Sequence, residues 1–485
     1  MEARTTRRRL LQAGAGATVA AAAGYGAASL VASERRNVVL IVVDTLRVDH
    51  VFGDRARTPS IDSLAAAGVS YTNCFPEAMP TVPARNSILA GRRQFPFRDW
   101  RRHRGLVDQP GWEPLDALDQ SLLSVLRRSG YWTAYATDNP FLGFARPFAP
   151  LRRSVDRFAR SDGQLGPGRN PEAISERELR HWLHPSIENT DTRRRMANYL
   201  ANNRRYQEDE SQSFAARVFE DGIRLVDQAP QGKPFALVLD TFQPHEPWTP
   251  PRAYVDLYDA PAHRGREPSL PPYERVDAYL GKGRQAVLDR MRALHAAEVT
   301  LTDRWLGAFL DHLRARGLER DTAIVLVGDH GIYLGERGWT GKISISLHPE
   351  LIQVPLIVVH PRRKLAGRRS RYPASTQDIA PTLLSLAGVD VPKAMDGADL
   401  SRPFRGRELP ERPYSYGGYR NSFFIRNRRW ALFGHNSGDG LRLYDLRRDP
   451  GELRDVARGH RDVVRRLRRR VVAGAGGRLP YYDQD

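Results

Sequence analysis

The stretch "NVVLIVVD", residues 37–44, is a continuous run of β-branched and aliphatic side chains that ends in an aspartate. Similar runs follow along the chain: "YWTAYATD" (131–138), "PFALVLD" (234–240), "TAIVLVGDH" (322–330) and "VPLIVVH" (354–360). Runs that are apolar on both faces are typical of parallel strands in a sheet covered by helices. Helical patterns lie between them, such as "TPSIDSLAAAG" (58–68) and "ALHAAEVTLTDRWLGAFLDHLRARG" (293–317). The sequence therefore predicts an α/β sandwich with a mostly parallel central sheet flanked by helices.

Polar residues stand where these runs end. Asp44 closes the first run, and Asp329 and His330 close the fourth. Ligands of such sheets bind beyond the carboxyl ends of the strands. A single polar residue at a strand end more often caps a helix or binds water. Their recurrence at equivalent ends of one sheet favours a site.

The composition is that of a globular protein. The 485 residues are 41% hydrophobic and 27% charged, and the formal charge is +19. The arginines that carry this charge are scattered along the chain, without a recognisable nucleic-acid-binding module, so we expect no nucleic-acid partner. A solvated basic surface is the simplest interpretation, with a polyanion site as the alternative. Attraction to a small anionic substrate is compatible with both.

The N-terminal residues 1–33 have the pattern of an export signal. An arginine cluster in "TTRRRLLQ" (5–12) precedes a weakly apolar run rich in alanine and glycine. The cluster resembles the twin-arginine signal of bacteria, which implies a partner in the export machinery. A membrane anchor is the weaker alternative, because alanine and glycine give little hydrophobic drive over a span of about 20 residues. We expect an extracytoplasmic protein, in the periplasm, the cell wall or the medium.

The remaining chain divides into two expected parts. Residues 34–365 hold the strand and helix patterns, with a polar, arginine-rich and irregular stretch at about 141–231 that we expect to be an insertion covering the site. Short strand patterns, "NSFFIRNRRWALFG" (421–434) and "LRLYDL" (441–446), predict a small antiparallel sheet. We assign it to a C-terminal subdomain over residues 366–485.

The segment "TVPARNSILAGRR", residues 81–93, is typical of a turn that opens a helix. Pro83 suits the first turn and Gly91 suits the end. Thr81 would then lie at the helix N-terminus, where free N–H groups favour an anion. Arg85 would lie one turn along the same face and could neutralise a negatively charged oxygen. Taken alone, these two residues are more often a helix cap and a surface arginine.

Eight segments in order resemble the sulfatase family of the alkaline-phosphatase superfamily. Each is weak alone, but the ordered set is specific and spans residues 37 to 455. The segments are "VVLIVVDTLRVDH" (38–50), "TPSIDSLAAAGVSYTN" (58–73), "TVPARNSILAGRR" (81–93), "FQPHEPWTPP" (242–251), "LVGDHGIYLGERGWTGK" (326–342), "VPLIVV" (354–359), "DIAPTLLSLAGV" (378–389) and "LYDLRRDPGE" (443–452).

The resemblance implies an alkaline-phosphatase-like fold and a divalent cation held by Asp44, Asp329, His330 and the nucleophile's oxygen. Carboxylates suit Ca²⁺, Mg²⁺ or Mn²⁺, and the imidazole moves the preference toward Mn²⁺ or Zn²⁺. We favour Ca²⁺ or Mn²⁺, with Zn²⁺ as a further possibility. The resemblance also implies that His245 and Lys342 contact the substrate's anionic group and its leaving oxygen.

The family's nucleophile position falls on Thr81 and not on Cys74, the only cysteine. Pro83, Ala84 and Arg85 follow Thr81 in the family's register, whereas Cys74 occupies an alanine-like place seven residues earlier. Sulfatases oxidise a cysteine to formylglycine, whose hydrate expels sulfate by C–O cleavage. Threonine cannot do so, but a threonine phosphate can be hydrolysed at phosphorus. We expect Cys74 to be a small buried hydrophobe.

Two further departures from the family's pattern concern an aspartate pair and two cationic residues that hold sulfate. Thr45 replaces the second aspartate of the usual pair, and Asp138 and Pro140 replace a lysine and a histidine. The loss of these cations weakens the prediction of a sulfate monoester. Asp138 could bind a second metal or an ammonium group, although a turn residue at a strand end is the more common case.

The sequence thus predicts a metal-dependent ester hydrolase with Thr81 as covalent nucleophile and Arg85, His245 and Lys342 as catalytic residues. We expect a phosphate ester, in particular a phosphodiester, as substrate. The alternatives are a true sulfatase and an envelope transferase that passes the phosphoryl group to another alcohol. A non-catalytic binding protein is disfavoured because the whole residue set is present.

Overall fold

A computed structural model describes residues 35–482 except 116, 162–163, 165–169, 204–205, 207–208 and 260–264. The predicted export signal, residues 1–33, lies outside the described residues. Across the described ranges, no helix combines the length and the apolarity needed to cross a bilayer.

An eight-stranded sheet forms the centre of the molecule, in the order β11-β2-β10-β7-β1-β6-β4-β5. The strands are β1 (Asn37–Val43), β2 (Val69–Cys74), β4 (Trp132–Thr137), β5 (Arg157–Arg160), β6 (Phe235–Thr241), β7 (Thr322–Gly328), β10 (Val354–Val359) and β11 (Arg368–Ser370). The predicted runs all form strands, and β7, β1, β6, β4 and β5 are parallel. Strand β10 runs antiparallel to β7, so His360 ends it at the opposite edge of the sheet from Asp329.

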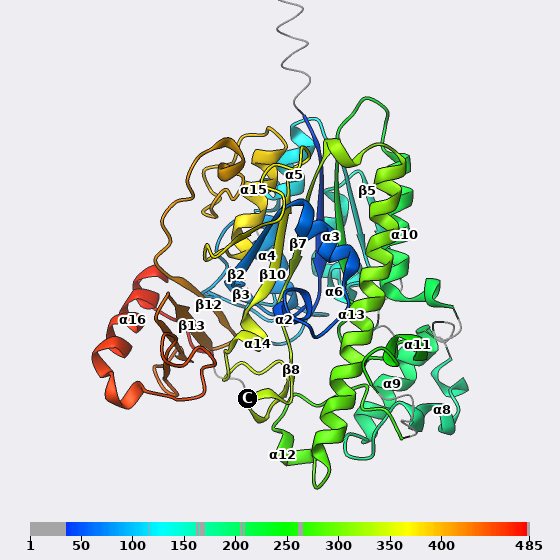
Figure 1. The fold of residues 1–485 in the computed structure, drawn as a ribbon, viewed down its shortest axis with the longest axis vertical. Coiled ribbons are helices and arrows are strands. Elements are labelled where there is room, and N and C mark those ends of the chain that lie inside the picture. Colours follow the sequence, from blue (N-terminus) through cyan, green and yellow to red (C-terminus); the bar gives the residue numbers. More distant parts are fainter. Residues whose placement is uncertain are drawn as a thin grey trace, which may run out of the picture.

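Successive side chains of β1 point to opposite faces of this sheet and pack into two separate cores. Val38, Leu40 and Val42 pack into a core with helices α4 (Thr81–Ala90), α5 (Leu122–Arg128) and α15 (Ile379–Leu386). Val39, Ile41 and Val43 pack into a second core with α3 (Pro59–Ala67), α10 (Phe214–Gln228) and α13 (Arg284–Ala315). Figure 1 shows α10 and α13 on one side of the sheet and α5 and α15 on the other. The predicted sandwich is confirmed.

The polar stretch 141–231 is more regular than expected. It holds most of α6 (Pro140–Phe144), α7 (Ala149–Arg153), β5, α8 (Glu176–His181), α9 (Thr190–Asn203) and α10. Strand β5 extends the central sheet beside β4, and α10 covers it. The expectation of an irregular insertion was wrong for these two elements, because α10 carries a buried apolar stripe among its polar residues. That stripe includes Phe214, Val218, Phe219, Leu225 and Val226.

A second, five-stranded sheet has the order β15-β14-β13-β12-β3. Its strands are β3 (Ala78–Met79), β12 (Ser415–Tyr419), β13 (Ser422–Arg426), β14 (Trp430–His435) and β15 (Arg442–Asp445), and α16 (Arg461–Gly474) packs on it. The predicted antiparallel sheet is therefore present, with β3 added in parallel from the segment before Thr81. The expected division at residue 365 does not match a change of sheet, because β11 and α15 still pack with the large sheet.

Short elements follow the carboxyl ends of the parallel strands. They are α2 (Val48–Val51), α11 (Arg252–Val255), α12 (Val276–Tyr279), α14 (Pro349–Ile352) and the ribbon of β8 (Tyr333–Leu334) and β9 (Thr340–Gly341). In Figure 1 the labels α11, α12 and β8 lie below the central sheet. The loops between these elements carry the site residues described next.

Candidate active site

Four neighbouring strands bring acidic residues to one edge of the sheet. Asp329 follows β7, Asp44 follows β1, Asp240 lies near the end of β6, and Asp138 follows β4. All four side chains are fully buried. Because the strands are adjacent and parallel, residues that are far apart in the chain lie in one row. The structure thus brings Asp44, Asp329 and the residues beside them to the same edge of the sheet, and their role as a site stays a prediction.

Asp44, Asp329 and His330 each offer one ligand atom, and these atoms lie within 4.8 Å of one another. Oδ1 of Asp329 accepts hydrogen bonds from the backbone N–H groups of Thr45, at 3.0 Å, and His330, at 2.7 Å. Nδ1 of His330 lies 2.9 Å from the carbonyl oxygen of Gly331 and donates to it. That bond leaves Nε2 as the unprotonated ring nitrogen, which is the form that binds a metal.

The electrostatics of this cluster fit a divalent cation. Burial and the charge of Asp329 raise the pKa of Asp44 well above its usual range. Burial lowers the pKa of His330 to about 4, so its ring is neutral at pH 7. Both carboxylate oxygens of Asp44 and Nε2 of His330 have no hydrogen-bond partner among the described residues. Buried polar atoms of this kind are costly unless a ligand satisfies them, and carboxylate and imidazole ligands suit a divalent metal ion.

Arg85 joins this cluster to the start of helix α4. Its Nη1 lies 3.2 Å from Oδ2 of Asp44, contacts Oδ2 of Asp329, and donates to the carbonyl oxygen of Thr81 at 3.2 Å. One nitrogen therefore contacts all three residues. Burial alone would lower the pKa of Arg85, but Asp240, Asp329 and Asp44 raise it well above its usual range. The guanidinium stays charged.

Helix α4 begins at Thr81 and ends at Gly91, whose φ of 61° is the left-handed conformation of a helix C-terminus. Every residue of the helix is buried. Thr81 follows β3, which pairs with β12 of the small sheet, so its position is fixed on both sides. The structure confirms the predicted helix and places Thr81 at its first turn, next to the acidic cluster.

His245 and Lys342 form a second group. Nζ of Lys342 lies 2.9 Å from Nε2 of His245 and 3.7 Å from Oε1 of Glu246, and Tyr273 donates its hydroxyl hydrogen bond to the same Oε1. Burial lowers the pKa of His245 to about 3. Its Nδ1 therefore donates to the carbonyl oxygen of Glu246 at 2.7 Å, and Nε2 accepts from Lys342. In this pair the proton donor is Lys342.

The two groups interact electrostatically. The charge of Lys342 lowers the pKa of His330, behind the larger effect of burial. It also opposes the rise in the pKa of Asp44. The charge of Lys342 therefore acts on the acidic cluster.

Comparison with known proteins decides the family. The family model described as sulfatase matches residues 36–389, and the model described as N-sulphoglucosamine sulphohydrolase, C-terminal, matches residues 335–474. The chain belongs to the sulfatase family. It is an ester hydrolase of that family.

The relatives of this sulfatase-family protein fall into more than one class. It is 24% identical over 486 residues to an arylsulfatase of Clostridium perfringens (strain 13 / Type A), covering 92% of this chain and 95% of the relative. It is 27% identical over 427 residues to the multifunctional alkaline phosphatase superfamily protein PehA of Trinickia caryophylli, covering 78% of each. In fold it resembles a phosphonate monoester hydrolase from Silicibacter pomeroyi, with a TM-score of 0.67 and 20% identity over 92% of this chain and 96% of that one.

Four residues of the site were not assigned from the sequence of this sulfatase-family chain. Asp240 pairs with Arg85 and accepts from Tyr135, and Glu246 pairs with Lys342 and accepts from Tyr273. Asp240 was visible as the end of an apolar run, but nothing local showed which side chain it would meet. The two tyrosines gave no signal, because one alternates within a strand and the other lies in a loop.

Asp138 contacts the edge of the site. Its Oδ1 accepts from the backbone N–H of Phe242 at 2.6 Å, and its Oδ2 has no hydrogen-bond partner among the described residues. Burial raises its pKa to about 7. The ring of Phe242 stacks on His245, with 4.1 Å between ring centroids. In the part of the chain that the structure describes, no second cluster of three metal-binding side chains includes Asp138.

Cys74 lies at the end of β2 and faces the apolar core. Its side chain is fully buried, and burial raises the pKa of the thiol far above its usual range. A buried thiol with a raised pKa is a poor nucleophile. The prediction that Cys74 is a small buried hydrophobe is confirmed.

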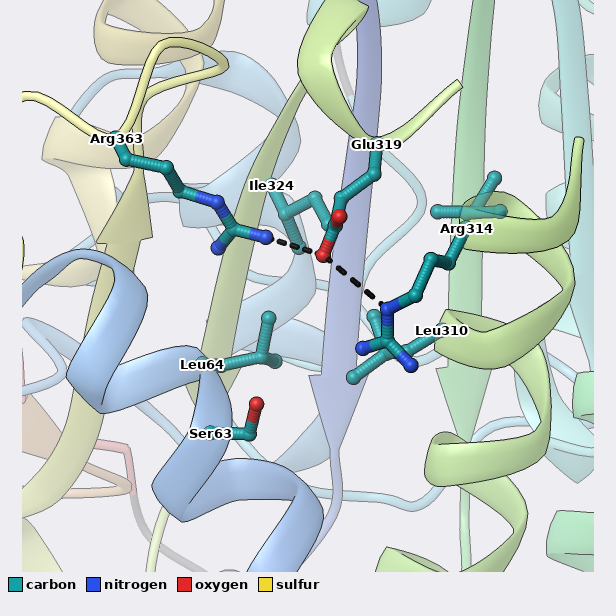
Figure 2. A pocket seen from close by; sticks show the side chains of 8 residues that line it. Ser63, Leu64, Leu310, Arg314, Glu319, Ile324 and Arg363 are labelled. Carbon is teal, nitrogen blue, oxygen red and sulfur yellow. Dashed lines mark hydrogen bonds and ion pairs between the residues drawn. The ribbon is translucent and has the colours of Figure 1, made fainter. Parts of the chain in front are cut away.

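A cavity of about 20 Å³ lies elsewhere, between α3, α13 and the start of β7. Figure 2 shows the carboxylate of Glu319 between Arg363 and Arg314, with which it forms ion pairs. Apolar side chains such as Leu64 and Leu310 also line the cavity. The cavity has room for a water molecule only. Because Ile324 lies near the amino end of β7, the cavity is at the opposite edge of the sheet from Asp329.

Proposed function

We propose that this protein hydrolyses phosphate esters, in particular phosphodiesters, by a covalent intermediate on Thr81. The observation that carries the proposal is the contact of one Arg85 nitrogen with the Thr81 carbonyl and with the carboxylates of Asp44 and Asp329. It brings the start of α4 and the acidic cluster together. A hydroxyl at a buried helix N-terminus beside such a cluster is suited to attack an anionic ester.

Asp44, Asp329, His330 and the hydroxyl of Thr81 would hold the divalent cation, with Mn²⁺ or Ca²⁺ favoured and Zn²⁺ as an alternative. When bound, the cation supplies positive charge that stabilises the ionised nucleophile and the transition state. The charged Arg85 adds to this field because it lies within the same cluster.

The chain's own residues divide the remaining work. Oγ of Thr81 releases its proton to the solvent, attacks phosphorus and forms the new P–O bond while the bond to the leaving alcohol breaks. Lys342, which contacts His245 and Glu246, would give that alcohol its proton and regain one from the solvent. Water then attacks phosphorus, its proton is released, and the P–O bond to Thr81 breaks as Oγ is reprotonated. The net reaction adds one water across the ester bond.

Three features favour phosphorus over sulfur. Threonine cannot form the formylglycine hydrate with which sulfatases release sulfate. Asp138 stands where the family has a lysine that holds sulfate, and it brings a carboxyl group to a place that otherwise carries positive charge. The fold is similar to that of proteins described as phosphonate monoester hydrolases. The small anionic substrate would thus be a singly charged phosphorus ester.

A sulfate ester is the second candidate. The relative from Clostridium perfringens that covers 92% of this chain is described as an arylsulfatase. Release of sulfate from Thr81 would then require attack of water at sulfur.

The test is a matched series of nitrophenyl esters with the purified, Mn²⁺-loaded protein. We expect the highest kcat/KM for the phosphodiester or phosphonate and the loss of that activity in Thr81→Ala. A sulfate preference that survives in Thr81→Ala would overturn the proposal. Transfer of phosphate to an added alcohol instead of water would identify the enzyme as a transferase.

We also propose that the arginine-containing segment 1–33 directs export of the folded protein. Replacement of Arg7, Arg8 and Arg9 by lysine should retain the protein in the cytoplasm of a bacterial host with a twin-arginine pathway. Unchanged export would contradict this assignment.

A further inference from the structure

Asp240 holds one edge of the Arg85 guanidinium. Nε of Arg85 lies 3.0 Å from Oδ1 and 3.1 Å from Oδ2 of Asp240, and Nη2 lies 2.7 Å from Oδ1. The hydroxyl of Tyr135 donates to Oδ2 at 2.8 Å. All three side chains are buried. Asp240 is therefore fully occupied by one arginine and one tyrosine.

The other side of the same guanidinium faces the proposed metal ligands. Only Nη1 contacts Asp44 and Asp329, and it also donates to the carbonyl of Thr81. Arg85 is thus divided between two partners, with Nε and Nη2 on Asp240 and Nη1 on the acidic cluster. A two-point contact fixes the plane of a guanidinium more firmly than a single bond does.

This division matters because Arg85 and a divalent cation need the same carboxylates. An arginine free to turn both nitrogens onto Asp44 and Asp329 would compete with the cation for their oxygens. The charge balance points the same way. When ionised, Asp44, Asp329 and Asp240 against Arg85 leave two negative charges, which a divalent cation neutralises.

We propose that Asp240 is a positioning residue that limits Arg85 to a contact through Nη1 alone with the metal ligands and so sets the affinity of the site for its divalent cation. Tyr135 supports this role by fixing the second oxygen of Asp240. The inference rests on the proposed function, because it takes Asp44, Asp329 and His330 as metal ligands. It assigns a role to two residues of β6 and β4 that make no contact with the substrate in the proposed reaction.

The competing explanation is that Asp240 only neutralises a buried arginine. Loss of one partner of a buried ion pair destabilises a protein wherever the pair lies. Glu267 offers a matched control, since it also forms a buried two-point pair, with Arg290 at 2.7 and 2.6 Å, outside the site. Glu267→Gln and Asp240→Asn remove the same charge from similar pairs.

The experiment measures Mn²⁺ binding to the metal-free protein by calorimetry, without substrate, beside thermal unfolding of each variant. We expect Asp240→Asn to weaken Mn²⁺ binding by about 10-fold to 100-fold, as for other residues that orient metal ligands. Tyr135→Phe keeps the charge and should weaken binding by a smaller factor, on the order of two to five. Glu267→Gln should lower stability and leave Mn²⁺ binding unchanged. At saturating Mn²⁺, Asp240→Asn should lower kcat more than it raises KM.

Wild-type Mn²⁺ affinity in both Asp240→Asn and Tyr135→Phe would overturn the inference and leave the proposed function intact. If Asp240→Asn does not fold, Tyr135→Phe decides alone, since it removes one hydroxyl. If the wild-type protein binds none of Mn²⁺, Ca²⁺ and Zn²⁺, both proposals are overturned. Normal metal binding that depends on Asp240, without phosphodiesterase activity, would contradict only the proposed function.

Discussion

The short segment from Cys74 to Thr81 has a potentially nucleophilic side chain at each end, and the two lie in different surroundings. Cys74, at the end of β2, packs against the apolar core, and burial raises the pKa of its thiol. Thr81 is seven residues further along the chain and begins α4. Its carbonyl shares the Arg85 nitrogen that contacts Asp44 and Asp329. The thiol is intrinsically the better nucleophile, but burial raises its pKa, whereas the backbone of Thr81 lies beside a guanidinium that two carboxylates share.

The difference between these positions comes from the elements that carry them. Strand β2 lies inside the large sheet, between β10 and β11, so its last residue points into packed side chains. Helix α4 starts at the carboxyl edge, where the parallel strands deliver their acidic residues. Under the proposed function, the position of each side chain and not its intrinsic nucleophilicity decides which of the two reacts.

The largest loss of activity is expected on substitution of Thr81, the proposed nucleophile. Thr81→Ala should lower kcat by on the order of 10³-fold or more, because it removes the hydroxyl of the proposed nucleophile. Thr81→Ser keeps the hydroxyl and should retain part of the activity, which makes it the matched control. Steady-state kinetics on a nitrophenyl phosphodiester measure both. Equal activity in Thr81→Ala and wild type would show that the nucleophile lies elsewhere.

The next effect concerns the charge beside Thr81. Asp44→Asn removes one of the proposed metal ligands, so we expect activity to fall by on the order of 10²-fold or more even with excess Mn²⁺. Mn²⁺ at 100 times its Kd should stabilise the wild type by about 2.7 kcal/mol and the variant by much less. Thermal unfolding with and without Mn²⁺ tests this directly. An identical shift in both proteins would remove Asp44 from the metal site.

Asp138 adds a third position to the comparison of Cys74 with Thr81. Its side chain is as buried as that of Cys74, but it lies at the edge of the site. Burial raises its pKa from 3.8 to about 7. The folded protein therefore keeps a proton that the unfolded chain loses, and the wild type loses stability as the pH rises from about 4 to about 7. Asp138→Asn has no such titration.

We therefore expect Asp138→Asn to gain stability relative to the wild type between pH 5 and pH 8, by on the order of 1–4 kcal/mol. Denaturant unfolding at both pH values gives the difference. The asparagine oxygen can still accept the hydrogen bond of the Phe242 N–H, so the fold should persist. A stability difference that does not change with pH would mean that Asp138 is ionised throughout.

The smallest effect is expected at Cys74. Cys74→Ala should cost about 1–2 kcal/mol of unfolding free energy from lost packing, because the side chain is fully buried in the apolar core. Turnover should stay close to that of the wild type. Chemical denaturation and the phosphodiester assay measure these two quantities. A Cys74→Ala variant that folds but is inactive would indicate Cys74 and not Thr81 as the nucleophile.

Much of the fold could be predicted because its signals are local. The runs that became β1, β4, β6 and β7 carry their own apolar pattern, and α4 carries its proline and its terminal glycine. The antiparallel direction of β10 could not be predicted from the local sequence, because it depends on the connection to the strand and not on the strand's composition. The two-residue strand β3 is likewise too short to give a pattern.

The site likewise contains residues that local motifs predict and residues that only the tertiary fold brings together. Asp44, Thr81 and Asp329 could be predicted from motifs, and the structure brings them together. Asp240 could be seen only as a strand end, because its partner Arg85 is 155 residues away in the chain. Glu246 lies next to His245 in sequence, but its contact with Tyr273 joins two separate loops. Pairings of this kind depend on the tertiary fold.

The most direct measurement is peptide mass spectrometry of the protein quenched during turnover of a slow phosphodiester. Mapping the peptide that spans Cys74 and Thr81 locates any covalent group on one or the other. We expect a phosphoryl ester adduct on Thr81 and an unmodified thiol at Cys74. An aldehyde at Cys74, or an adduct on any residue other than Thr81, would contradict this expectation.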